Sequence, residues 1–333
     1  MRVLVTGATG FIGHHLVHRL VAMGDEVRCL VRPTSETDAI AALGVDLRVG
    51  DVTQPHTLGP AVAGVQTVYH LAGSIRAAGN DDLWRINEGG TQHVTEACTA
   101  AREPPVLVIA SSIAVAGPSD PERPHVEADP PTPVSDYGRS KLAAERAARA
   151  LSARVPITVV RPPVVFGEHD RETFDLFRMA AKGWHVVPGP RAQRLSLCHA
   201  ADLAQLMVRA AEAGERLDAD ATRGRGLYYA GDTEHPTYAE LGLLLARAVG
   251  RQKLRVVPAP QAFTWGVAAI AEIAARVRGQ PALLGIDKAR EATAGSWMCS
   301  SEKARTQLGL KLGVSLSDRL AQTAAWYREA GWL

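Results

Sequence analysis

The sequence has 333 residues, enough for about two domains or for one large α/β domain with an appendage. Apolar residues make up 46% and charged residues 22%, which excludes a chain that is disordered throughout. The 37 Lys and Arg residues nearly balance 35 Asp and Glu residues, and a net charge of +2 selects neither nucleic acid nor an anionic membrane as a partner.

The first half of the sequence alternates strand and helix signals. Apolar runs predict strands at residues 3–5, 26–31, 45–49, 67–71, 106–110 and 157–160, and helical periodicity predicts helices at 11–23, 81–101 and 136–153. The strand runs lack polar alternation, so both faces of the sheet should be buried. This pattern predicts an α/β fold with a doubly wound parallel sheet of the Rossmann type.

The second half of the sequence has a different pattern. Helices are expected at 173–181, 201–213, 238–249 and 315–328, separated by short apolar runs and turns. We therefore expect residues 1–165 to form a dinucleotide-binding domain. Residues 166–333 should form a smaller α+β domain that mainly binds substrate, with some segments returning to the sheet.

Two segments stand apart from these elements. Residues 118–133 hold six prolines and should form a surface loop, and a loop of this kind could serve as a lid near the site. The apolar segment 263–277 is too short, and with Glu272 too charged, to span a bilayer. An amphipathic core helix is the favoured interpretation of that segment, and an interfacial contact with a membrane is the alternative.

The cysteines and the N-terminus bear on location in the cell. The four cysteines (Cys29, Cys98, Cys198 and Cys299) are far apart and form no C-x-x-C pair, which indicates reduced thiols rather than disulfides or a zinc site. The N-terminal residues indicate a strand rather than a signal peptide, so we expect a cytoplasmic protein. His14 and His18 have metal-ligand spacing on a helix, but the sequence offers no convincing third ligand and we expect no metal.

A glycine-rich turn follows the first strand. Gly7, Gly10 and Gly13 lie in T-G-A-T-G-F-I-G, between a strand and a helix. Glycines there let the backbone approach a pyrophosphate, and the helix N-terminus offers free N–H groups to it. The turn therefore predicts a dinucleotide site.

Further motifs follow in a fixed order along the chain. They are Gly50-Asp51-Val52, His70-Leu71-Ala72-Gly73, Asn87-Glu88-Gly89-Gly90-Thr91, Ser111-Ser112, Tyr137-Gly138-Arg139-Ser140-Lys141, Arg161-Pro162-Pro163-Val164-Val165-Phe166-Gly167 and His199-Ala200-Ala201-Asp202-Leu203. With the three-residue glycine spacing, this set resembles the extended short-chain dehydrogenase/reductases of the NAD-dependent epimerase/dehydratase family. Many nucleotide-sugar enzymes have Asn after the Arg-aromatic pair of the sixth strand. Here the residues are Arg161-Pro162-Pro163-Val164, which is more similar to the dihydroflavonol reductase and 3β-hydroxysteroid dehydrogenase branch.

The resemblance implies a nicotinamide cofactor and residues that hold it. Asp51 would accept from the adenine amine, the backbone of Val52 would contact the base, and Pro162 and Val165 would hold the nicotinamide. The full cofactor set implied is Gly7, Thr9, Gly10, Phe11, Ile12, Gly13, Arg32, Asp51, Val52, Leu71, Ala72, Gly73, Asn87, Tyr137, Lys141, Pro162 and Val165. Arg32, rather than an acid, ends the second strand, and an Arg there would pair with the 2′-phosphate, so NADP is preferred over NAD.

Ser112, Tyr137 and Lys141 form the candidate catalytic set. Tyr137 and Lys141 are four residues apart, on one face of the predicted helix. A cation beside a tyrosine stabilises the phenolate, so Tyr137 could exchange a proton while Ser112 bonds to the substrate oxygen. A Tyr and a Lys at this spacing most often lie on a solvated helix face and have no catalytic role. Here the pair follows the glycine turn and the strand-end serine in the expected order, which favours a catalytic role.

The favoured function is therefore an oxidoreductase that interconverts a secondary alcohol and a ketone on a small molecule. Ile113 and Ala114 replace the acid pair of nucleotide-sugar 4,6-dehydratases, which disfavours dehydration. A nucleotide-sugar epimerase with retained NAD and a non-catalytic NADP-binding regulatory protein are the alternatives. Family members often pair through the helices expected here at 81–101 and 136–153, which implies a homodimer.

Overall fold

The structure is a computed structural model that describes residues 1–75, 80–189, 192–220, 222–278, 285–311 and 313–333. Its centre is a seven-stranded parallel sheet in the order β10-β6-β5-β4-β1-β2-β3. The strands are β1 (Arg2–Thr6), β2 (Glu26–Val31), β3 (Asp46–Val49), β4 (Thr67–His70), β5 (Val106–Ala110), β6 (Ile157–Arg161) and β10 (Leu227–Tyr229). The doubly wound parallel sheet is thus confirmed, with β10 supplied by the second half of the chain.

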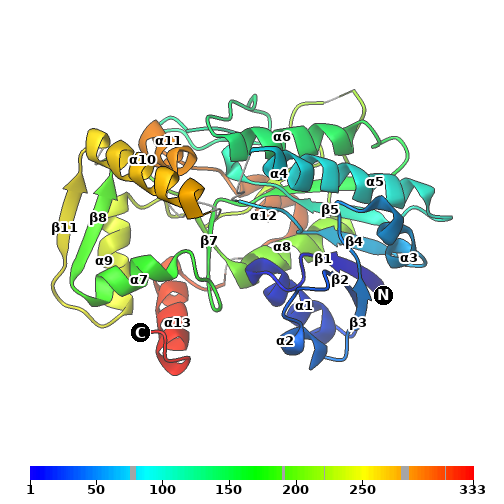
Figure 1. The fold of residues 1–333 in the computed structure, drawn as a ribbon, viewed down its shortest axis with the longest axis horizontal. Helices are drawn as coiled ribbons and strands as arrows, with labels where there is room; N and C mark the ends of the chain where they lie inside the picture. Colours follow the sequence, from blue (N-terminus) through cyan, green and yellow to red (C-terminus); the bar gives the residue numbers. More distant parts are fainter. Residues whose placement is uncertain (76–79, 190–191, 221, 279–284, 312) are drawn as a thin grey trace.

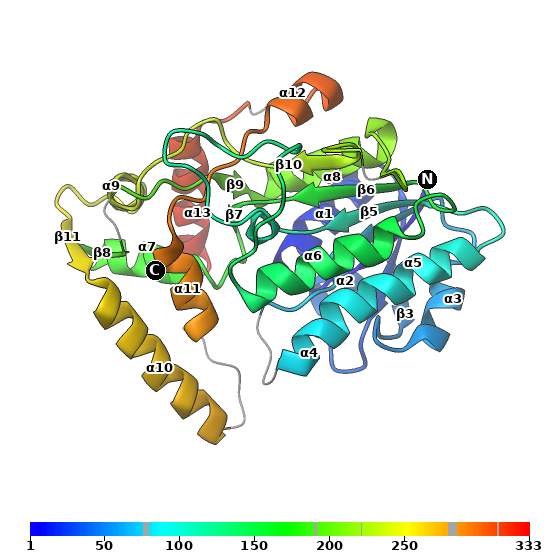
Figure 2. The same ribbon diagram turned by 90° about the horizontal axis from the view of Figure 1, so that it is seen from above.

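Helices cover both faces of this sheet (Figures 1 and 2). One face packs against α1 (Phe11–Ala22), α2 (Asp38–Ala41), α8 (Ala200–Ala213) and α12 (Glu302–Leu308). The other packs against α3 (Leu58–Val62), which follows the short turn η1 (Pro55–Thr57), and against α5 (Gly90–Ala100) and α6 (Asp136–Arg149). These two apolar layers make the core that the strand composition predicted.

The predicted helix at 81–101 is divided into three parts. It consists of α4 (Asn80–Trp84), the π-helical turn η2 (Arg85–Gly89) and α5. A π turn widens the helix by one residue and redirects the side chains in it. Here it contains Asn87, whose side chain is buried at the candidate site.

The second half builds a third apolar core beside the sheet. It contains α7 (Phe174–Ala181), α9 (Tyr238–Ala248), α13 (Leu316–Glu329) and two parallel strand pairs, β7 (Val164–Phe166) with β9 (Leu197–His199) and β8 (Trp184–Pro188) with β11 (Arg255–Ala259). The four helices expected in this half are confirmed within one or two residues at each end. The sequence analysis did not identify the strand pairs, because runs of three to five residues carry little periodicity.

Residues 118–133 form an irregular loop, as expected, and backbone bonds join Ser119 to Ser296 and His125 to residues 298–300. One expectation needs correction. The segment 263–277 is helical, within α10 (Gln261–Arg278), but the favoured core placement is wrong: Phe263 and Ile270 are 63% and 71% exposed. Helix α11 (Ile286–Ala294), beside α10, was not predicted.

Candidate active site

The glycine turn packs tightly against the end of β4. Gly7 has φ +73°, and a Cβ there would lie 2.7 Å from the amide nitrogen of Ala72. A Cβ at Gly13 would lie 2.1 Å from the carbonyl oxygen of Gly7. Only glycine therefore fits at both positions, and the backbone forms a cradle into which a phosphate can approach closely.

The N-terminus of α1 opens onto this cradle. Gly10 caps the helix without a side-chain acceptor, so the protein supplies no oxygen to the first N–H groups. Thr9, Phe11 and Ile12 complete the turn and the first helical residues, as predicted. With the positive end of the helix dipole, this arrangement fits a pyrophosphate.

A buried histidine links the turn to the neighbouring strand and helix. His70, 2% exposed at the end of β4, has Nδ1 2.7 Å from Thr6 Oγ1 and Nε2 3.0 Å from Thr91 Oγ1. The Thr91 hydroxyl donates its proton to the carbonyl of Asn87 at 2.6 Å, so it accepts from Nε2–H of His70. Burial and the nearby Lys141 lower the pKa of His70 to about 3, which agrees with a neutral ring that accepts from Thr6 at Nδ1.

The sequence analysis gave His70 no role. The available signal was a histidine at the end of an otherwise apolar strand, followed after 21 residues by a threonine. Thr6 and His70, 64 residues apart, meet because β1 and β4 are adjacent, and Thr91 reaches the ring from α5.

Asn87 fixes the loop that leaves β4. Its Oδ1 accepts from the Ser74 amide at 2.8 Å, and its Nδ2 donates to the Ser74 carbonyl and to Ser140 Oγ, both at 2.9 Å. A Cβ at Gly73 would meet Asn87 Oδ1 at 3.1 Å and Lys141 Nζ at 3.6 Å. The structure thus brings Asn87 and Lys141 together beside Gly73, all three of which were predicted. Leu71 and Ala72, also predicted, directly precede Gly73 in the same backbone segment.

The residues predicted on the adenine side follow the neighbouring strands β2 and β3. Asp51 accepts from the amide and the hydroxyl of Thr53, both at 2.8 Å, which orients its carboxylate. Val52 is buried, and its carbonyl lies 2.9 Å from Nδ1 of His93. Arg32, directly after β2, is exposed, and its amide donates to Ser35 Oγ at 3.2 Å.

The Ser112 hydroxyl lies near enough to Tyr137 to lower the pKa of the phenol. Ser112 lies between β5 and the short turn η3 (Ile113–Val115), and its Oγ also accepts from the Ala114 amide at 3.1 Å. Burial raises the pKa of Tyr137 above its ordinary value, and the Ser112 hydroxyl opposes that rise. At neutral pH Tyr137 is therefore a phenol, able to donate a proton.

Lys141 lies one turn further along α6, with its side chain 8% exposed. Burial lowers its pKa to about 8, and the Glu145 carboxylate acts in the opposite direction. Its amine donates to the carbonyl of Ala110 at 2.6 Å. Glu145 is itself paired with Arg161 at 2.6 Å in a buried ion pair, so the charge behind Lys141 is compensated.

Of the residues predicted on the nicotinamide side, Pro162 lies between β6 and β7, and Val165 lies in β7. The carbonyl of buried Pro162 accepts from the Ile113 amide at 2.9 Å, joining this segment to the one that follows Ser112. Val165 is partly buried and pairs with Cys198 in the β7–β9 register.

Helix α11 supplies a contact that the sequence analysis missed. The carboxylate of Asp287 accepts from the amides of Asp136 and Tyr137 at 2.8 and 3.1 Å, and Glu291 accepts from Ser135 Oγ at 2.6 Å. These acids, four residues apart, cap the first turn of α6 from a separate element. An acid pair so spaced is common on exposed helices, so the sequence held no distinctive signal.

Other features lie apart from this set. Within the described residues, no group of three or more His, Cys, Asp or Glu side chains is placed to hold a metal, and the His14 ring lies 4.3 Å from that of His18 between centroids. All four cysteines are buried with free thiols. Also among the described residues, no helix combines the length and apolar character needed to cross a membrane.

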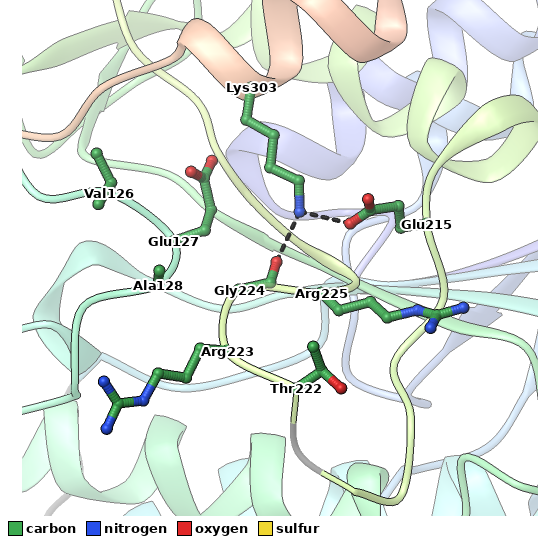
Figure 3. Close-up of a pocket in the computed structure, with 9 residues that line it drawn as sticks. All are labelled: Val126, Glu127, Ala128, Glu215, Thr222, Arg223, Gly224, Arg225 and Lys303. Carbon is green, nitrogen blue, oxygen red and sulfur yellow. Dashed lines mark hydrogen bonds and ion pairs between the residues drawn. The ribbon is translucent and has the colours of Figure 1, made fainter.

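Two hollows of about 470 and 480 Å³ open near α12, and none of Ser112, Tyr137 and Lys141 lines either. Figure 3 shows the first, where the Lys303 amine donates to Glu215 and to the Gly224 carbonyl, both at 2.6 Å. Because none of the three candidate catalytic residues lines either hollow, we do not place the reaction there.

Comparison with known proteins gives the family. A ceramide reductase of Caulobacter vibrioides is 31% identical over 334 aligned positions, covering 99% of this chain and 96% of that protein. A 3 beta-hydroxysteroid dehydrogenase/Delta 5-->4-isomerase of Mycobacterium tuberculosis is 27% identical over 77% of this chain and 72% of its own. A structure of Thermus thermophilus UDP-glucose 4-epimerase with NAD is similar in fold, with a TM-score of 0.77, 22% identity and coverage of 99% and 100%. The model of the NAD dependent epimerase/dehydratase family matches residues 3–221, and the chain belongs to that family of enzymes.

Proposed function

We propose that this enzyme interconverts a secondary alcohol and a ketone on a hydrophobic small molecule, using a nicotinamide cofactor and Ser112, Tyr137 and Lys141. The observation that carries the proposal is the grouping of Lys141 and Asn87 around Gly73, with Tyr137 one turn before Lys141 on α6 and the Ser112 hydroxyl acting on the Tyr137 phenol. A bound nicotinamide would supply or accept the hydride.

The chain's own groups would handle the proton and the oxygen. In reduction, Ser112 would donate a hydrogen bond to the ketone oxygen and Tyr137 would transfer its phenolic proton to the same atom. A protonated Lys141 would stabilise the phenolate that remains. Its pKa of about 8 keeps it mostly protonated at neutral pH.

The glycine cradle, the open N-terminus of α1, and Asp51, Val52, Asn87, Pro162 and Val165 would hold the cofactor. The family uses NAD, and we propose NADP for this member because the cation Arg32 follows β2 and no acid stands there. Four free thiols favour a cytoplasmic enzyme.

A hydrophobic substrate is favoured by two observations. Ile113 and Ala114, both buried, follow Ser112, so no carboxylate is available there for dehydration. The ceramide and hydroxysteroid relatives are named for lipid-like molecules. We propose that residues 1–165 bind the cofactor and that residues 166–333 mainly bind this substrate.

The test is a substrate panel followed by nicotinamide absorbance. Purified enzyme is supplied with NADPH or NADH and with long-chain ketones, steroid ketones or UDP-sugars. We expect stoichiometric oxidation of NADPH with an apolar ketone. Interconversion of UDP-sugars without added cofactor would instead support the epimerase, and tight NADP binding without turnover on any ketone or sugar would support a regulatory protein.

We also propose a homodimer through α5 and α6. Ala144 and Ala148 are buried against the sheet, whereas Ala143 and Ala147 are only partly buried and give α6 a second stripe of small residues. Light scattering should give twice the mass of the 35.5 kDa chain. A single-chain mass would refute the dimer, and a dimer that survives Ala147→Glu would have its interface elsewhere.

A further inference from the structure

Helix α10 presents an apolar stripe to solvent. Phe263, Val267, Ile270 and Ile273 are 63%, 39%, 71% and 63% exposed, and their spacing places them along one side of the helix. We call these four residues the α10 stripe. Exposed apolar residues scattered singly are normal, but four in a row along one helix indicate an interaction site.

The opposite side of α10 is already occupied. Ala268 is buried, α10 packs against α11, and Trp265 Nε1 donates to Thr293 Oγ1 of α11 at 3.3 Å. Figure 2 shows α10 projecting from the body of the molecule beside α11. The stripe is therefore the outer face of a helix that is anchored on its inner face.

Positive charge gathers around this helix. Residues 249–285, between α9 and α11, contain five Lys or Arg residues and a single acid, although the whole chain is nearly balanced. Lys253 and Arg255 are exposed just before the helix, and Arg278 is exposed at its end. The acid, Glu272, accepts from the Ile286 amide at 3.3 Å and so is directed toward α11.

An apolar stripe between cations is the composition of a helix that lies in a membrane interface. The apolar side chains enter the acyl boundary while Lys and Arg contact anionic headgroups. A second copy of the chain would cover the stripe less well, because an isologous contact would bring the two cationic segments together.

We propose that the α10 stripe docks the enzyme on an anionic phospholipid surface. The helix lies flat on the bilayer and does not cross it. Because α10 packs on α11, and Asp287 of α11 caps the first turn of α6 at Tyr137, docking brings the catalytic end of α6 toward the lipid. Delivery of a membrane-dissolved substrate rests on the proposed function, whereas docking itself does not.

The test is co-sedimentation with vesicles of phosphatidylglycerol and phosphatidylcholine, compared with pure phosphatidylcholine. The double variant Ile270→Glu/Ile273→Glu should lose binding at least about tenfold, and each of Lys253→Ser and Arg255→Ser should lose about fivefold. Val49→Glu is the matched control: Val49 is 69% exposed on β3, far from α10 in Figure 1, and should bind as the wild type does.

Three results would overturn the proposal. The first is equal binding of the wild type to anionic and to pure phosphatidylcholine vesicles, and the second is equal binding by the wild type and the double variant. The third is a wild-type protein that binds no vesicles and is a dimer in light scattering, when the double variant is a monomer. The Tyr137→Phe variant separates the proposed reaction from the proposed docking. If this variant loses turnover and still binds vesicles, docking does not depend on the reaction. Wild-type vesicle binding with no turnover on any ketone would reject the proposed reaction alone.

Discussion

The two sides of helix α6 are held by different kinds of contact. On the sheet side, buried polar groups bond to backbone carbonyls and to neighbouring side chains: Lys141 donates to Ala110, Asn87 donates to Ser74 and Ser140, and His70 bonds to Thr91. On the α11 side, carboxylates of a separate helix accept from the first turn of α6, and α10 beyond it presents an apolar stripe to solvent. We propose that the sheet side carries the chemistry and the other side gives access to the lipid surface, so changes on each side should affect different measurements.

The largest effect should come from the sheet side. Tyr137→Phe removes the phenolic proton and keeps the ring, so turnover should fall by roughly 10²–10⁴-fold. Cofactor affinity, measured by titration of nicotinamide fluorescence, should change little. Turnover equal to that of the wild type would reject Tyr137 as the proton donor.

The substitution Lys141→Met should have the next largest effect, which is on the free energy of unfolding. Burial lowers the pKa of Lys141 from 10.5 to about 8, so between these values the unfolded chain holds a proton that the folded chain has released. Stability from this group therefore rises with pH across that window. Relative to Lys141→Met, the wild type should gain up to about 3 kcal/mol in free energy of unfolding, measured in urea from pH 7.5 to 10.

A constant difference between wild type and Lys141→Met over that range would contradict the buried, low-pKa lysine. Ser140→Ala is a control on the same helix, because it removes a buried hydroxyl that does not titrate there. It should shift the free energy of unfolding by a similar amount at every pH.

The sequence predicted the sheet side much better than the other. Motif order located Gly7, Asn87, Ser112 and Tyr137, because close backbone approach and buried polar groups restrict which residues fit. It could not place His70 between Thr6 and Thr91, since that bridge depends on strand order. It predicted the position of helix α10 correctly, but it wrongly predicted that the apolar face of this helix is buried. Periodicity identifies an apolar face and does not show what covers that face.

The preference for NADP or NAD tests the role of Arg32, which directly follows β2. Arg32→Asp removes a cation and adds a repelling charge near the predicted 2′-phosphate, so the NADP/NAD affinity ratio should fall about ten- to hundredfold. Direct titration with both dinucleotides measures the ratio. Arg48→Asp, exposed on the neighbouring strand β3, is a control for general charge and should change it less. Wild-type protein that binds NAD more tightly than NADP would contradict the role of Arg32.

The smallest expected effect lies on the α11 side, at Asp287. Asp287→Ala removes the acceptor of the Asp136 and Tyr137 amides, and loss of a helix cap costs about 1 kcal/mol. If the contact also positions Tyr137, kcat should fall severalfold at temperatures where the variant is fully folded, with KM nearly unchanged, because only the placement of the proton donor is altered. Asp287→Asn keeps one acceptor oxygen and should recover part of kcat.

Asp175→Ala provides the comparison that separates positioning from stability. Asp175 is also in the first turn of a helix, α7, and its ion pair with Arg178 is exposed, so its loss should affect stability by less than about 1 kcal/mol. It should leave kcat unchanged. If Asp287→Ala lowers the free energy of unfolding but leaves kcat at the wild-type value, α11 only supports the fold, and the first turn of α6 holds Tyr137 in place without it.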